Sequence, residues 1–203
     1  MHDNGLVCQK GGVRSALRII IFVLIMGTIS GGLLVGVNNF TQPLVLINEE
    51  LKLKSSVLDV LDIPYEKSET IAIFDSRVKV LKKNEYTFYI ASDQSVAFEF
   101  HGPGLWGPIS GIASLEKDLK TIRNIKITHQ EETPGLGGRI AETPYLKQFR
   151  GKSIFPKLIF KPEGYAMGVN EVDAITGATG SSRAFEKLIN ENAQKYLSAL
   201  RGR

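Results

Sequence analysis

The chain has 203 residues, a net charge of +4 and 43% hydrophobic residues. This composition excludes a largely disordered protein and gives no sign of nucleic-acid binding, and the length is enough for one membrane anchor and one moderate domain. The one cysteine, Cys8, excludes an intrachain disulfide, and the three histidines have no metal-ligand spacing, so we expect no metal site.

An apolar run near the N-terminus is the first clear element. Residues 16–37 contain a single charge, Arg18, which leaves roughly the ~20 apolar residues that a helix needs to cross a bilayer. We therefore expect a transmembrane helix over residues 15–37. A cleavable signal peptide is the alternative, but its apolar core is usually shorter and ends at a small-x-small site, which residues 37–40 match poorly.

The charges around this run predict its orientation. Lys10, Arg14 and Arg18 lie at its start, whereas residues 38–47 contain no lysine or arginine. By the positive-inside rule, residues 1–14 form a cytoplasmic segment and everything after the span is extracytoplasmic. The expected location is the inner (plasma) membrane, crossed once.

Residues 38–63 keep a helical pattern, because apolar residues recur at three- and four-residue spacings until Ile63 and Pro64 end it. We expect a helical connector over 38–63, followed by a domain over 64–203.

Alternating stretches in that domain predict strands near 78–82, 86–91, 95–101, 108–115 and 121–130. A short helix near 141–149, a strand near 157–161 and a long amphipathic helix over 182–200 follow, the last with Ser181 or Ser182 as its N-cap. The expected fold class is α+β, with a mostly antiparallel sheet and a C-terminal helix.

The run at residues 173–179, DAITGAT, lies just before that helix. Its glycine permits a tight turn, and the free N–H groups of a helix start favour a phosphate. The D-x-x-[ST]-G-A-T pattern resembles the site at which a flavin transferase esterifies the phosphate of FMN to a threonine hydroxyl. A plain glycine turn with hydroxyl caps is the alternative.

Two glycine-rich segments strengthen the functional interpretation: residues 101–109 (HGPGLWGPI) and residues 131–139 (EETPGLGGR). With DAITGAT and the apolar span, they resemble the three signatures of the covalent-FMN subunit family. That family includes the C subunit of the Na+-translocating NADH:quinone reductase and the G subunit of the Rnf complex. The resemblance covers almost the whole chain. The HGPGLW run is closer to the quinone-reductase subunit, whereas Thr176 and the compact region before HGPGLW also fit the Rnf type.

The resemblance implies that Thr179 carries FMN, with Ser181 and Ser182 as much poorer candidates. It implies an extended cofactor site and no catalytic residue in this chain. The other cofactor-binding residues expected are Asp173, Thr176, Gly177 and Ala178 in the motif, and Leu105, Trp106, Glu132, Thr133, Leu136 and Gly137 around the isoalloxazine ring, with Glu132 and Thr133 as polar contacts at its edge. A simple turn and a stiff loop remain the alternatives for the two upstream segments.

The expected function is therefore electron transfer by an FMN subunit of a membrane ion-translocating oxidoreductase. Its expected partners are other integral-membrane and redox subunits, a flavin transferase for maturation, and membrane lipid. Two alternatives remain: a stand-alone anchored FMN carrier that serves an extracytoplasmic reductase, and a non-redox membrane-tethered binding module.

Overall fold

The computed structural model describes residues 12–201. Cys8, Lys10 and the rest of residues 1–11 lie outside the described residues, as does most of the predicted cytoplasmic segment. The chain divides into two compact units, one ending at Glu50 and the other beginning at Leu51.

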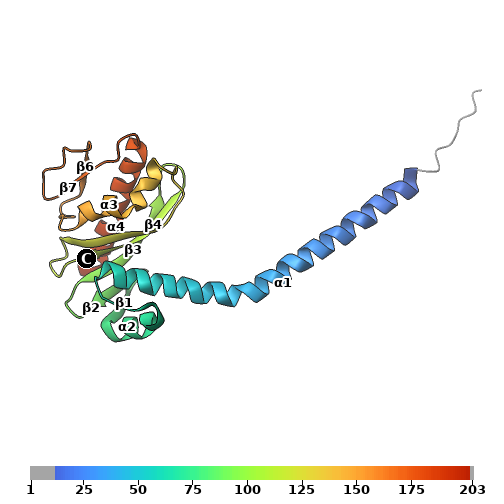
Figure 1. Cartoon of the computed structure of the whole chain (residues 1–203), viewed down its shortest axis with the longest axis horizontal. Helices are drawn as coiled ribbons and strands as arrows, with labels where there is room; N and C mark the ends of the chain where they lie inside the picture. The colour runs from blue at the N-terminus through green and yellow to red at the C-terminus, as the bar shows by residue number, and fades with distance from the viewer. Residues whose placement is uncertain (1–11, 202–203) are drawn as a thin grey trace, which may run out of the picture. The chain divides into compact units, whose positions relative to one another are not determined.

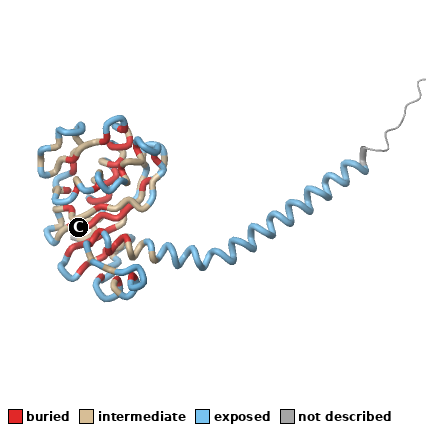
Figure 2. The backbone as a smooth tube through the Cα atoms, in the orientation of Figure 1, coloured by how far each residue is buried: buried red, intermediate tan, exposed pale blue. Residues whose placement is uncertain are grey.

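The first unit consists of the greater part of helix α1 (Gly12–Val60), which has Pro43 inside it. Within the described residues, this is the one helix long and apolar enough to cross a membrane; the mean hydropathy of its most apolar stretch is 2.4, and none of that stretch is buried. Large apolar side chains such as Leu34 and Phe40 are 73% and 81% exposed, and Figure 2 shows the whole stretch as exposed. The predicted helix over residues 15–37 is present and continues without a break into the predicted connector.

The second unit is built on a five-stranded antiparallel sheet in the order β1-β2-β3-β4-β5 (Figure 1). Its strands are β1 (Val78–Lys83), β2 (Tyr86–Ala91), β3 (Val96–Pro103), β4 (Pro108–Leu115) and β5 (Ile122–Gln130). All five predicted strands are present within two residues of the predicted ends. Because side chains alternate along a strand, Phe98 and Phe100 share one face of β3 and Ala97 lies on the other.

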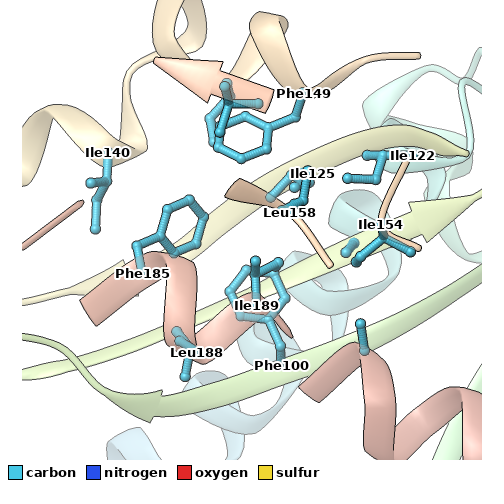
Figure 3. Packing of buried hydrophobic residues seen from close by; sticks show 14 of the residues in the cluster. Phe100, Ile122, Ile125, Ile140, Phe149, Ile154, Leu158, Phe185, Leu188 and Ile189 are labelled. Carbon is cyan, nitrogen blue, oxygen red and sulfur yellow. The ribbon is translucent and has the colours of Figure 1, made fainter. Parts of the chain in front are cut away.

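Helix α4 (Thr179–Arg201) covers the first face. Phe185 and Ile189 are fully buried against Phe100 and neighbouring residues of the sheet, as Figure 3 shows. The ring centroids of Phe185 and Phe100 lie 6.2 Å apart. The predicted helix is therefore confirmed, although it begins three residues earlier than expected.

The opposite face of the sheet is covered by the last residues of α1 and by α2 (Thr70–Arg77). Val57 and Leu58 of α1 and Phe74 of α2 pack with Tyr89 and Ile112 of the sheet. The sequence did not predict α2 or the single turn η1 (Lys67–Glu69) before it, because eight residues are too few to establish a helical period.

Short elements connect β5 to α4. They are η2 (Gly137–Ala141), α3 (Thr143–Leu146), η3 (Lys147–Phe149), β6 (Ile159–Lys161) and β7 (Glu171–Asp173). The helix predicted over 141–149 is thus broken into single turns, and the strand predicted over 157–161 is three residues long. It pairs in parallel with β7, a strand that the sequence analysis did not identify. The predicted α+β class, with a mostly antiparallel sheet and a C-terminal helix, is confirmed.

Candidate functional site

The DAITGAT run forms a tight turn that leads directly into α4. Asp173 ends β7, the N–H of Ala178 donates to the carbonyl of Ile175 at 3.0 Å, and Gly177 has a φ of +80°. That left-handed conformation favours glycine. The turn brings Thr179 to the first residue of the helix, with its side chain exposed.

The first helical bond is donated by the N–H of Ser182 to the carbonyl of Ala178, at 3.0 Å. The amides of residues 179–181 therefore precede the helical hydrogen-bond pattern, as the first N–H groups of any helix do. Together with the positive end of the helix dipole, they favour an anionic group beside the hydroxyl of Thr179.

Ser181 and Ser182 do not cap the helix, so that prediction was wrong. Both lie inside its first turn and are buried. Ser182 Oγ accepts a hydrogen bond from the N–H of Ile175 at 3.0 Å, which secures the preceding turn. Ser181 Oγ donates to Glu132 Oε2 at 2.6 Å. Of the hydroxyls in residues 179–182, only that of Thr179 is on an exposed residue.

Glu132 joins the three glycine-rich segments. Its side chain is buried, with 3% of the residue exposed. Oε1 accepts from the N–H groups of Leu105 at 2.6 Å and Trp106 at 3.1 Å, while Oε2 accepts from Ser181 Oγ. Glu132 was expected at the site from the sequence, but its partners, which are 26 to 49 residues away along the chain, were not.

Glycines allow the segments to approach this closely. A Cβ on Gly104 would lie 2.3 Å from Glu132 Oε1, and a Cβ on Gly137 would lie 2.3 Å from Ser181 Oγ. Neither distance is physically possible, so a side chain at either position would push the segments apart.

Apolar side chains surround the exposed turn. Leu105 lies against Gly180, where an added Cβ would be 2.7 Å from Leu105 Cδ2. Leu136 lies beside Gly177, with Cδ2 3.7 Å from the position of an added Cβ. Leu105 and Leu136 are about half exposed, at 51% and 48%, and Trp106 is 74% exposed. Leu105 and Leu136 thus place exposed apolar surface beside the turn.

Other predicted site residues have local roles or lie at the edge of this arrangement. The carbonyl of Thr133 accepts from the N–H groups of Leu136 and Gly138, at 3.2 and 2.9 Å, and so shapes the loop. Asp173 Oδ1 accepts from the N–H of Ala166 at 3.0 Å, and its backbone pairs with the Gln148 side chain.

A cavity of about 300 Å³ lies beside the turn, between α4 and β6. Thr176, Gly177 and Thr179 line it together with two cations, Lys161 and Arg183, and two carboxylates, Glu163 and Glu186. Its size falls at the lower end of the range for small-molecule pockets. Burial, with help from the charges of Asp173 and Glu186, raises the pKa of nearby Tyr145, so that its hydroxyl stays protonated at neutral pH.

Comparisons with known proteins show which domains this part of the chain resembles. Residues 104–194 match the family of FMN-binding domains. This segment contains Leu105, Glu132 and Thr179, and thus all three converging segments. The match lies within the second unit of the chain, whose fold is described above.

Individual relatives show which proteins of this kind the chain is similar to. The chain is 45% identical over 62 residues to the C subunit of the Na(+)-translocating NADH-quinone reductase of Chlamydia trachomatis, covering 30% of this chain and 20% of that protein. It is 28% identical over 139 residues to the same subunit of Haemophilus ducreyi, covering 63% of this chain and 52% of that protein. The chain thus matches from about a fifth to about half of these relatives' lengths.

Solved structures support the fold. The crystal structure of this subunit from Parabacteroides distasonis superimposes with a TM-score of 0.66 at 24% identity, covering 75% of this chain and 93% of the other. The predicted resemblance to the family that includes these C subunits is confirmed.

Proposed function

We propose that this chain is the FMN-carrying subunit of a membrane oxidoreductase of the sodium-translocating NADH:quinone reductase type. The observation that carries the proposal is the exposed hydroxyl of Thr179 at the first residue of α4, inside the segment that matches the FMN-binding domain family. The curated C-subunit relatives favour this type of complex over the Rnf type.

Thr179 is the proposed covalent attachment point, through a phosphoester bond. The turn fits such a group, because Gly177 leaves its backbone exposed and the free amides of the first helical turn favour a phosphodiester charge.

Attachment would require a flavin transferase and a flavin nucleotide whose phosphate is activated as an anhydride. The Thr179 oxygen would bond to phosphorus and lose its proton, while the anhydride P–O bond breaks and the nucleotide part leaves. The chain would then gain the mass of one FMN less one water.

The apolar surface of Leu105, Trp106 and Leu136 is the proposed cover for the isoalloxazine ring, since aromatic and aliphatic side chains pack well on flat apolar rings. The backbone of Thr133 and Gly137, and the motif residues Asp173, Thr176 and Ala178, would shape the rest of the site. A bound flavin supplies one- or two-electron transfer, and the protein orients it and tunes its potential.

The apolar part of α1 is the proposed single membrane span, with the N-terminus in the cytoplasm and the FMN domain outside. The proposed partners are the other membrane and redox subunits of the complex, which would oxidise NADH and carry the ion path, together with surrounding lipid. This chain would pass electrons from one such subunit to the next.

The attachment can be tested with two threonine variants of the full chain, each produced together with a flavin transferase. Thr179→Ala should abolish the fluorescent band on a denaturing gel and the added mass of one FMN less water. Thr176→Ala is the matched control, because Thr176 is also an exposed residue of the same turn; it should keep at least part of the flavin. A Thr179→Ala chain that still carries covalent flavin would refute the assignment.

The complex can be tested by purification from the native membrane. Co-purification with an NADH-oxidising flavoprotein subunit would support the quinone-reductase type, whereas a ferredoxin-like partner would indicate the Rnf type. A flavin-loaded chain without integral-membrane partners would indicate a stand-alone carrier. A colourless chain without flavin would indicate a non-redox module.

A further inference from the structure

The buried carboxylate of Glu132 lies where the three glycine-rich segments meet. We propose that Glu132 is a positioning residue, which fastens the Leu105–Trp106 loop and its own loop to the first turn of α4. This proposal rests on the function proposed above, because it concerns how the flavin surface around Thr179 is held in shape. It replaces the expected direct contact between Glu132 and the ring.

The hydrogen bonds account for this role. Both carboxylate oxygens already have protein partners: Leu105 N–H and Trp106 N–H on Oε1, and Ser181 Oγ on Oε2. All three partners donate, which is what a carboxylate accepts. The N–H of Glu132 itself donates to Gln130 Oε1 at 2.7 Å, so the backbone of this residue is held as well.

The position of the carboxylate also excludes a simple surface role. Only 3% of Glu132 is exposed, whereas its neighbour Glu131 is an exposed residue. Gly104 and Gly137 lie against the carboxylate. A Cβ added to Gly104 would be 2.3 Å from Oε1, and a Cβ added to Gly137 would be 2.8 Å from Oε2. The backbone therefore packs closely around this one side chain. Without the carboxylate, the N–H groups of Leu105 and Trp106 and the buried hydroxyl of Ser181 would lose this acceptor, and such a loss is costly at a buried group.

The geometry has a direct consequence for the proposed flavin surface. Glu132 holds the backbone of Leu105 and Trp106, whose side chains are exposed, and Ser181, which follows Thr179 by two residues. One side chain therefore fixes the distance between the proposed ring cover and the proposed attachment point.

The test uses the full chain in detergent, first without flavin. Glu132→Gln replaces one acceptor oxygen by a donor amide that faces existing donors. Amide hydrogen exchange at Leu105 and Trp106 should then become roughly ten- to hundredfold faster, as expected for loss of hydrogen bonds to a charged group. Trp106 is the single tryptophan of the chain, so its fluorescence anisotropy reports the same loop and should fall.

Two further variants serve as controls. Glu131→Gln makes the same chemical change one residue away, at an exposed side chain, and should leave both signals unchanged. Ser181→Ala keeps the carboxylate and removes only its third donor, so exchange at Leu105 and Trp106 should rise less, by roughly two- to tenfold. If Glu132→Gln does not fold, Ser181→Ala alone decides: no acceleration at these amides would overturn the proposal.

The flavin-loaded chain gives the second readout. Glu132→Gln should still receive FMN but lose at least half of the visible circular dichroism of the flavin, because the ring is no longer held in one orientation. Unchanged exchange and unchanged dichroism in Glu132→Gln would overturn the proposal even if Thr179 carries FMN. Conversely, faster exchange in a chain that never receives flavin would support the fastening role and refute only the proposed attachment.

Discussion

The middle of α4 and its first turn belong to one helix but are built in opposite ways. From Phe185 to Ala193 the inner side of the helix is apolar and buried between the sheet and the segments that lead to α4. The first turn has small or polar residues, an exposed Thr179, and contacts made by backbone groups and one carboxylate. The first part supplies stability, whereas the second presents Thr179, the proposed attachment point, at the surface.

This difference has a physical cause. Apolar burial is non-directional and tolerates many arrangements, so it suits a core. The proposed attachment site would have to admit a large cofactor and a modifying enzyme, and glycine-rich turns provide the open space and backbone donors for both. The two parts of α4 should therefore respond to mutation independently.

The largest effect should come from the core. Phe185→Ala removes a fully buried ring that packs near Phe100, Phe149 and Phe160, and should lower the free energy of unfolding by about 3–5 kcal/mol. Urea denaturation measures this loss. The fraction that remains folded should still accept flavin at Thr179, and a selective loss of flavin in the folded fraction would show that the two parts are not independent.

A smaller loss should follow from crowding the junction of the segments. Gly137→Ala places a Cβ 2.3 Å from Ser181 Oγ and 2.8 Å from Glu132 Oε2, which should cost about 1–3 kcal/mol. Gly138→Ala is the control, because its Cβ would approach no atom closer than 3.3 Å. Equal stability of the two variants in urea would contradict the close packing described for the site.

Gly177→Ala tests the turn without crowding it. The nearest atom to the added Cβ would be Leu136 Cδ2 at 3.7 Å, so the cost comes from the backbone, which has a φ of +80°. A left-handed conformation costs a non-glycine residue about 1–2 kcal/mol. We expect a stability loss of about 1 kcal/mol with a measurably slower rate of flavin attachment. An unchanged rate would indicate that the transferase does not require this turn geometry.

The smallest effect should come from an ion pair far from α4 in the sequence. Asp93 Oδ2 lies 2.7 Å from Arg123 Nη2. Burial acts to raise the pKa of Asp93, but hydrogen bonds from Ser95 and the charge of Arg123 outweigh it and lower this pKa from 3.8 to about 2. The folded state therefore binds this proton more weakly than the unfolded state does.

This difference in proton binding makes the free energy of unfolding depend on pH. The stabilisation from Asp93 is complete above about pH 4 and is lost as the pH falls towards about 2. Because the Asp93 side chain is half exposed, Asp93→Asn should cost less than about 1 kcal/mol at pH 7. Urea titrations at pH 7 and pH 3 should show a smaller acid-induced loss in the variant than in the wild type, with flavin attachment unchanged. A variant with the same acid dependence would exclude Asp93 as its source.

The sequence predicted the regular part of the fold because periodic burial leaves a periodic pattern. The five strands and α4 were identified in this way. Elements of three to eight residues, such as β7 and α2, contain too few residues for a period. The first turn of α4 was placed three residues late because Ser181 and Ser182 resemble caps in sequence, whereas their hydroxyls bond to Glu132 and Ile175.

The sequence indicated which residues belong to the candidate site but not how they are arranged. The resemblance to the covalent-FMN subunit family indicated Thr179 and the two glycine-rich segments. It contained no information on the partners of Glu132, because hydrogen bonds between residues 26 to 49 positions apart depend on the tertiary fold.

The central claim is that Thr179 carries FMN, and locating the modified residue in the wild-type chain tests it most directly. Trypsin should release residues 158–183 as one peptide, since Lys161 precedes a proline, and this peptide contains Thr176, Thr179, Ser181 and Ser182. Electron-transfer fragmentation then assigns the added mass to one of these hydroxyls. The account predicts one FMN less water on Thr179 alone; the same mass on Thr176, Ser181 or Ser182, or an unmodified peptide from a chain produced with an active flavin transferase, would contradict it.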